Sequence, residues 1–149
     1  MLTGAQRSKG LEIGLSGAIT PQWQVSAGYA LQDAEIRKTT SAAPAGREVP
    51  LVPKQQVSLW TRYDFTPRFG AGVGVYHQSK SFTSISNTAV LPAFTRVDAA
   101  AFFKLTPQIE AQINVENLLD SNYFSSAYND NNIMPGAPTT ARATVRMSF

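Results

Sequence analysis

The chain has 149 residues, of which 43% are hydrophobic, 10% aromatic and only 15% charged, and its formal net charge is +3. This is the length of one ordinary domain, but the charged fraction is low for the surface of a soluble protein. The absence of Cys excludes a disulfide scaffold, a Cys-ligated metal site and a thiol nucleophile. No apolar run is long enough for a membrane-spanning helix, and the first residues lack the order of a signal peptide. These counts leave open a membrane protein built from strands.

The positive charges do not form a cluster in the sequence. The 13 Lys and Arg residues are scattered from Arg7 to Arg146. A nucleic-acid-binding surface usually appears as a basic run or a basic helix face, so the sequence predicts no nucleic-acid partner.

Apolar residues recur with a period of two in seven stretches of about ten residues each, which is the spacing of strands with one apolar face. From Trp23 to Leu31 the odd positions are apolar, whereas the even positions are small or polar. The same split of odd and even positions recurs in the other stretches, and it places the large apolar side chains on one face of each strand. The seven predicted strands cover residues 11–19, 23–32, 56–65, 69–76, 96–105, 109–116 and 142–149.

Two kinds of connection alternate between these strands. Three are tight and share the pattern apolar-Thr-Pro-x-apolar, at residues 19–23, 65–69 and 105–109. Proline presets φ for a turn and cannot donate to a strand ladder, so these are predicted hairpin turns. The other three connections, at about residues 37–54, 80–92 and 120–138, are long and polar. The sequence therefore predicts an all-β, antiparallel up-and-down sheet.

Alternation alone does not show which face is exposed to water. A soluble sheet buries its apolar face in a core, whereas a membrane barrel turns its apolar face to lipid. The strand length matches a tilted bilayer crossing, and short turns alternate with long loops as in outer-membrane barrels. The even-numbered face carries too many charges for a packed core, but a water-filled lumen tolerates them. Aromatic residues at odd positions near the tight turns or the chain end predict a membrane-interface girdle: Trp23, Phe65, Phe69, Phe103 and Phe149.

The direction of the strands follows if the tight turns are periplasmic. The first strand then starts outside the cell and the seventh ends in the periplasm at Phe149. Complete outer-membrane barrels have an even number of strands, and seven strands leave two open edges that lipid cannot solvate. The pattern predicts the C-terminal piece of a larger barrel, with Met1 as an artificial or internal start.

Several segments resemble the C-terminal barrel of TonB-dependent siderophore receptors, and most closely the ferric-catecholate branch of that family. They are residues 7–12, 52–61, 91–99, 113–123 and 135–138, together with the last strand ending at Phe149. The resemblance covers essentially the whole chain, except that Thr139 stands where the family usually has Arg. It implies that residues 1–149 supply about seven strands of a transmembrane barrel of about 22 strands, without the plug domain.

The same resemblance implies a function in iron import. Its expected partners are a ferric siderophore, the TonB complex through a missing N-terminal region, outer-membrane lipid and lipopolysaccharide, and the barrel assembly machinery. The expected location is the bacterial outer membrane, with no enzyme activity, no metal site and no cofactor, and the chain alone is not expected to transport. The siderophore itself is not predicted. The alternative is a small autonomous eight-stranded outer-membrane barrel with a structural or adhesive role.

Two groups of residues are candidates for binding. Tyr123, Tyr128, Asn129 and Asn131 in the last long loop offer aromatic and amide contacts to a siderophore, although Asn also commonly builds turns. The lumen-facing charges Arg96, Asp98, Arg142 and Arg146 form the second group. The three arginines are suited to attract anionic ferric complexes, to bind plug carboxylates, or to pair with Asp98, Glu110 and Glu116.

Three further features have specific interpretations. Glycines at positions 70, 72 and 74 are expected to leave lumen space for a plug. The single His, His77, has an odd number and so points outward, away from any lumen site that would need a base. Phe149, which follows Val145 and Met147 at alternate positions, resembles the signal that the outer-membrane assembly machinery recognises.

Overall fold

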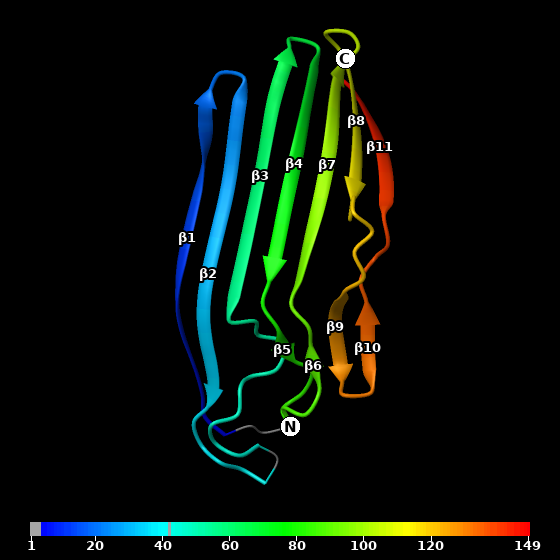
Figure 1. The fold of residues 1–149 in the computed structure, drawn as a ribbon. Coiled ribbons are helices and arrows are strands. Elements are labelled where there is room, and N and C mark those ends of the chain that lie inside the picture. Colours follow the sequence, from blue (N-terminus) through cyan, green and yellow to red (C-terminus); the bar gives the residue numbers. More distant parts are fainter. Residues whose placement is uncertain (1–3, 42) are drawn as a thin grey trace.

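The computed structural model describes residues 4–41 and 43–149, and Met1, the expected internal start, lies outside them. Seven antiparallel strands form one sheet in the order β1-β2-β3-β4-β7-β8-β11 (Figure 1). No helix in the described part of the chain is long and apolar enough to cross a membrane. The strands are β1 (Gln6–Thr20), β2 (Trp23–Ile36), β3 (Gln55–Thr66), β4 (Phe69–Gln78), β7 (Phe94–Lys104), β8 (Ile109–Glu116) and β11 (Thr140–Met147).

The seven predicted strands and their up-and-down order are confirmed. Two small hairpins in the long connections were not predicted: β5 (Ser81–Phe82) pairs with β6 (Val90–Leu91), and β9 (Phe124–Asn129) pairs with β10 (Asn132–Pro135). Strands of two to six residues are too short to show a clear period of two, which explains why they were missed.

One division into odd and even faces holds across the whole sheet. Every pair of neighbouring strands aligns odd residues with odd and even with even, as in the pairs Leu11↔Leu31, Tyr29↔Val57 and Ala99↔Val115. The register shifts only beside two tight turns, between Ala18 and Thr20 and between Asp64 and Thr66. The apolar odd positions of the strands therefore form one continuous outward face, and the even positions form the opposite face.

The Thr-Pro motif forms its turns through the threonine hydroxyl. In each tight turn this hydroxyl accepts a hydrogen bond from a backbone N–H two or three residues later: from Gln22 to Thr20, from Phe69 to Thr66 and from Ile109 to Thr106. Such local bonds satisfy backbone groups that the ladder leaves free, and proline fixes the next φ. This explains why one motif recurs at all three tight turns.

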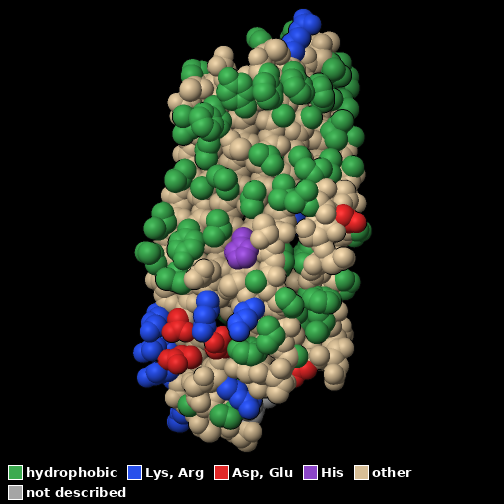
Figure 2. All heavy atoms as spheres, viewed as in Figure 1, with side chains coloured by type: hydrophobic (Ala, Val, Ile, Leu, Met, Phe, Trp, Pro, Cys, Tyr) green, Lys and Arg blue, Asp and Glu red, His purple; other side chains and the backbone are tan. Residues whose placement is uncertain are grey.

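The outward face is apolar and ends in an aromatic row at the tight turns. The rings of Tyr63, Phe65, Phe69 and Phe103 follow one another at centroid distances of 5.1, 5.6 and 5.2 Å. Figure 2 shows apolar side chains along this face and charged side chains near the loop end. On β1 the apolar positions run from Leu11 for about nine residues, the length of a tilted bilayer crossing. Phe65, Phe69 and Phe103 of the predicted girdle thus lie in one row beside the tight turns.

At the loop end of β1 and β2 the outward face becomes charged. Arg7 Nη2 lies 3.0 Å from Glu35 Oε1, and Lys9 Nζ lies 3.6 Å from Asp33 Oδ2. All four residues have odd numbers, so they continue the apolar face beyond Leu11 and Leu31. The outward face of β1 and β2 therefore changes from apolar to charged side chains toward the loop end.

The few fully buried residues lie mainly at the loop end. Residues 46–54 run back along β2, with hydrogen bonds from Gly46 N to Ile36 O (2.8 Å) and from Val49 N to Ala34 O (2.9 Å). This segment covers the end of β2 that extends beyond β3. The buried apolar residues are Ala34, Ile36, Ala43, Leu91, Ala100 and Ala127. The sheet thus has no core of its own, and a small core forms where loops fold onto it.

The sheet does not close on itself. Within the described residues β1 pairs only with β2, and β11 pairs only with β8. We expect the isolated chain, refolded in detergent, to migrate at the same position in an electrophoresis gel before and after boiling, because two open edges prevent a closed, detergent-resistant barrel. A boiling-dependent shift would contradict this and would favour the autonomous barrel.

Candidate functional site

The three long connections form one connected layer, called here the loop layer (residues 37–54, 80–92 and 120–138). Arg47 Nη1 donates to Ile85 O at 3.0 Å. The Asn87 side-chain amide accepts a hydrogen bond from Glu48 N–H at 2.8 Å and donates one to Glu48 O at 3.0 Å. It therefore pairs with both backbone groups of Glu48, as a residue of a neighbouring strand would. Asn87 has φ of 53°, a conformation that Asn tolerates better than most residues. The first and second loops are therefore joined by specific bonds.

Asp130 joins the third loop to the second. Its carboxylate, at the tip of the β9–β10 hairpin, accepts hydrogen bonds from the hydroxyls of Thr83, Ser86 (2.7 Å) and Thr88 (2.9 Å). These bonds, the one from Thr83 foremost, hold the pKa of Asp130 well below its usual range. Because the pKa of Asp130 is lowered, the stabilisation from these hydrogen bonds is fully present above the ordinary Asp pKa. It is lost as the pH falls from that value through the lowered pKa. The contact therefore persists at neutral pH.

We expect Asp130→Ala to separate the hairpin from the second loop. Hydrogen exchange at the amides of residues 83–88 should become several-fold faster, because three hydroxyls lose their shared acceptor. Asn131→Ala is the matched control, since the Asn131 side chain makes no hydrogen bond within the described residues and only its backbone N–H donates to Asn129. Equal exchange in the two variants would show that Asp130 does not hold the loops together.

The four predicted ligand-binding residues occupy different settings. Tyr123 is packed, because its ring stacks on Phe94 at a centroid distance of 4.3 Å and a Cβ at Gly136 would meet the same ring. Tyr128 is 85% exposed. Asn129 Oδ1 accepts from Asn131 N at 2.9 Å, which is the turn-building role of Asn. Three of the four residues thus lie in the β9–β10 hairpin, and Tyr123 lies below it, between the hairpin and the sheet.

Asn117 connects the end of β8 to the third loop, a role that the sequence reading missed. It is 1% exposed and has φ of 52°. Its amide nitrogen donates to Ser121 O and Ala137 O, both at 3.0 Å, and its amide oxygen accepts from Ser121 N at 2.9 Å. Its backbone N–H donates to Asp98 Oδ1 at 2.9 Å. One side chain therefore joins both ends of the loop to the sheet.

The even-numbered side chains of the seven strands form the lumen face. Arg96 pairs with Asp98 (Nη2 to Oδ2, 2.8 Å), as one of the sequence alternatives predicted. Arg142 and Arg146 also lie at even positions of β11, but neither forms an ion pair or a side-chain hydrogen bond with any described residue. Pairing with Glu110 or Glu116 is therefore absent for these two arginines.

Large aromatic side chains also lie on the lumen face, which the sequence reading missed. A Cβ at Gly72 or Gly74 would lie 2.7 or 2.6 Å from the Trp60 ring, and one at Gly70 would meet the Asp64 carboxylate. The expectation that these glycines leave lumen space for a plug is wrong, because neighbouring side chains fill the space. The sequence shows only that Trp60 has an even number, as the glycines do, because its pairing with Gly74 is set by the register between β3 and β4.

No group of three or more His, Asp or Glu side chains among residues 4–41 and 43–149 is placed to hold a metal ion. His77, at an odd position of β4, has Nδ1 2.8 Å from Thr95 Oγ1 on the outward face. Its predicted outward direction is confirmed.

Comparison with known proteins assigns the fold to a family. The family model described as "TonB dependent receptor-like, beta-barrel" matches residues 2–118. The probable TonB-dependent siderophore receptor PiuA of Acinetobacter baumannii is 34% identical over 135 residues, which are 84% of this chain and 18% of that protein. The catecholate siderophore receptor Fiu of Escherichia coli K12 is 32% identical over 152 residues, 98% of this chain and 20% of that protein.

This chain belongs to the TonB-dependent receptor β-barrel family.

Solved structures of this family agree with the fold. The PiuA crystal structure matches with a TM-score of 0.88 and 31% identity, over 95% of this chain and 22% of that one. The closed form of Fiu matches with a TM-score of 0.86 and 29% identity, over 97% of this chain and 21% of that one. This TonB-dependent receptor chain is thus a segment of a transmembrane β-barrel of the outer membrane, and it spans about a fifth of the length of these relatives.

Thr139, the departure from the family pattern, has a role in this TonB-dependent receptor chain. Its hydroxyl donates to Asn117 O at 2.7 Å, and its backbone N–H donates to Asp120 Oδ1 at 3.1 Å. The Thr139 side chain therefore ties the start of β11 to the Asn117 junction.

Proposed function

We propose that residues 1–149 form the C-terminal portion of the barrel of an outer-membrane receptor that imports ferric siderophores in a TonB-dependent manner. The observation that carries this proposal is that relatives named as siderophore receptors align with 84–98% of the chain, at 31–34% identity. The open edges of β1 and β11 support a place within a larger barrel. The plug and the TonB contact belong to the rest of that receptor, so the chain alone does not transport.

A ferric catecholate is the proposed substrate class, with the loop layer as its first contact. The catecholate receptor Fiu supports this class. Exposed Tyr128 and the amides of Asn129 and Asn131 offer stacking and hydrogen bonds at the hairpin tip. The receptor acts in binding and transport rather than catalysis. On its outward face, lipid covers the apolar positions and lipopolysaccharide meets the charged end of β1 and β2.

Uptake of radiolabelled iron tests this function. The complete receptor would be expressed in E. coli lacking its own catecholate receptors, and ferric catecholate, ferric citrate and ferric hydroxamate would be supplied separately. We expect uptake of the catecholate complex that is lost in a TonB-deficient strain and in a receptor without residues 121–137. Uptake that is independent of TonB, or no uptake of any of the three complexes, would refute the proposal.

Phe149 is proposed as the assembly signal read by the barrel assembly machinery. It is fully exposed beyond the end of β11, while Ser148 N still donates to Gln108 O of the last tight turn at 2.9 Å. We expect deletion of Phe149 to lower the outer-membrane level of the complete receptor without changing the sheet, because no described contact depends on its ring. A Phe149→Tyr control keeps an aromatic terminus. Unchanged assembly of the deletion variant would remove this role.

A further inference from the structure

The β9–β10 hairpin is held to the sheet at its base. The Tyr123 ring stacks on Phe94 of β7, at the loop end of that strand. The buried Asn117 amide donates to the carbonyls of Ser121 and Ala137, which lie at the two ends of the third loop. Because this contact is buried and combines ring packing with hydrogen bonds, local unfolding at the base is costly. The base of the hairpin is therefore a fixed point.

The tip of the hairpin is held as well, through Asp130 and the second loop. Thr83 N donates to Ala89 O at 3.1 Å, which closes this segment of the second loop into a turn. Inside the turn the hydroxyls of Ser86 and Thr88 lie 2.6 Å apart, and both donate to Asp130 Oδ2. The Thr83 hydroxyl donates to the other carboxylate oxygen. One carboxylate thus meets a preformed group of hydroxyls, so the tip has a defined position.

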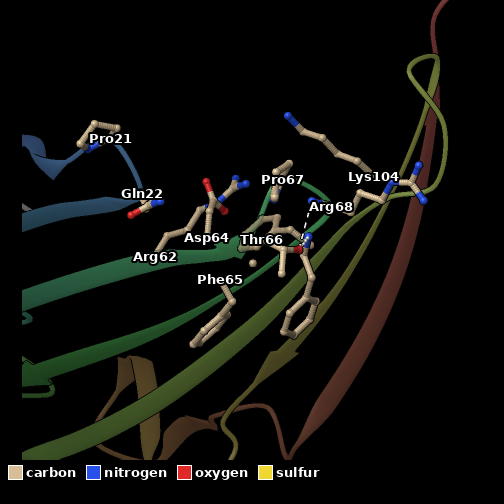
Figure 3. Close-up of a pocket in the computed structure, with 12 residues that line it drawn as sticks. Pro21, Gln22, Arg62, Asp64, Phe65, Thr66, Pro67, Arg68 and Lys104 are labelled. Carbon is tan, nitrogen blue, oxygen red and sulfur yellow. Dashed lines mark hydrogen bonds and ion pairs between the residues drawn. The ribbon is translucent and has the colours of Figure 1, made fainter.

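Between base and tip the hairpin packs on the second loop. β9 lies against β6, and each of these strands has a buried apolar residue, Ala127 in β9 and Leu91 in β6. The tight-turn end of the sheet is different, because a cavity of about 270 Å³ opens there beside Arg62, Arg68 and Lys104 (Figure 3). Direct contacts therefore join the two loops along the hairpin, whereas the opposite end of the sheet has open space lined by charged side chains.

Asp130 lies in the sequence between the residues proposed to meet the ligand, called here the tip residues (Tyr128, Asn129 and Asn131). Its carboxylate is bonded to the second loop, whereas the Tyr128 side chain is exposed. Holding Asp130 in place also holds the backbone on both sides of it, so the tip residues keep one arrangement. A ligand that binds an arrangement already formed does not pay the entropy of ordering it.

We propose that Asp130 is a positioning residue that joins the second and third loops into one preorganised wall (residues 80–92 and 120–138), which keeps its shape while the ferric complex binds and is imported. This inference rests on the proposed function. Asp130 acts on the ligand only through the tip residues, because its own oxygens are bonded to three hydroxyls of the second loop. The wall is held at base and tip, which distinguishes it from a lid that swings open to admit the ligand.

Binding kinetics of ferric catecholate to the complete receptor separate positioning from direct contact. In Asp130→Ala we expect the association rate to fall about fivefold with an unchanged dissociation rate, because only a fraction of receptors then holds the tip residues ready. Asp33→Ala removes the same charge from the outward face and should change neither rate. Faster dissociation with unchanged association would show that Asp130 touches the ligand, and two unchanged rates would show no role. Either result would overturn the proposal.

The unmodified receptor, measured in the same way, separates this inference from the proposed function. If it binds no ferric catecholate, the proposed function fails and this inference fails with it. If it binds normally and Asp130→Ala has the same rates, only this inference fails.

A reversible covalent bridge tests whether the wall keeps its shape. Thr88→Cys with Asp130→Cys, bridged by a short bis-methanethiosulfonate reagent, replaces a 2.9 Å hydrogen bond, and the chain has no Cys of its own. We expect the bridged receptor to recover the unmodified association rate and to import iron. After removal of the bridge with dithiothreitol, it should behave like Asp130→Ala.

A bridge within the hairpin is the matched control. Ser126 and Met134 pair directly across β9 and β10, so Ser126→Cys with Met134→Cys, added to Asp130→Ala, fixes the hairpin without joining it to the second loop. This bridge should not restore the association rate. Restoration by the control bridge would overturn the proposal. Loss of import in the Thr88–Asp130 bridged receptor, recovered on reduction, would also overturn it, because the hairpin would then have to open.

Discussion

Replacement of Ile113 by Arg is expected to destabilise the barrel by about 2–4 kcal/mol, the cost of a cation on the lipid face near the bilayer midplane. Ile113 lies in the middle of β8 at an odd position, is 45% exposed, and faces outward between Ala101 and Ala143. The free energy of unfolding would be measured for the complete receptor in lipid vesicles with a chemical denaturant. The large effect arises because lipid cannot hydrate the guanidinium.

The neighbouring residue provides the control. Gln112 points to the lumen face, where its amide donates to Asn114 Oδ1 at 2.7 Å. Gln112→Arg should change the free energy of unfolding by less than about 1 kcal/mol, because lumen positions are hydrated. Equal effects of the two substitutions would mean that the odd face does not meet lipid, and the orientation of the whole sheet would be wrong.

Replacement of Asn117 by Ala should cost about 3–4 kcal/mol of stability. The change leaves the N–H of Ser121 and the carbonyls of Ser121 and Ala137 without their partner, at about 1 kcal/mol each. The change also places Ala at φ of 52°, a left-handed conformation that Asn tolerates better than Ala, and this adds about 1 kcal/mol. Denaturant unfolding of the complete receptor in detergent measures the total, and hydrogen exchange of the Ser121 amide reports the junction itself.

Asn117→Gly separates the two contributions. Glycine accepts a positive φ without cost, so this variant should be about 1 kcal/mol more stable than Asn117→Ala while losing the same side-chain bonds. Fast exchange at Ser121 is expected in both. If exchange at Ser121 stayed slow in both variants, the loop would be held by contacts other than the Asn117 side chain, such as the bonds that Thr139 makes to the backbone carbonyl of Asn117 and to Asp120.

The strands could be predicted from the sequence because each signal is local. A strand orients successive side chains to opposite faces, so the alternation from Trp23 to Leu31 is readable without any partner strand. The Thr-Pro turns are local as well, since Thr66 and Thr106 bond to residues two or three positions later. The outward direction of His77 and the pairing of Arg96 with Asp98, two residues apart, follow from the same period.

The loop contacts could not be predicted, because they join segments far apart in the chain. Asp130 meets hydroxyls more than 40 residues earlier, and Asn87 reaches Glu48 almost as far away. Nothing in the Asn129–Asn132 sequence distinguishes a turn from a binding site, and the structure uses Asn129 to build the turn.

The sequence by itself determined the all-β class, the seven strands of the sheet, the odd apolar face and the alternation of tight turns with long loops. These depend on the period of two and on turn chemistry, which act within a few residues. Only the tertiary structure decided how cations scattered along the chain come together, because the register between strands sets which even positions are neighbours. The register likewise placed Trp60 over glycines expected to leave open space, and it left Arg142 and Arg146 without a described partner.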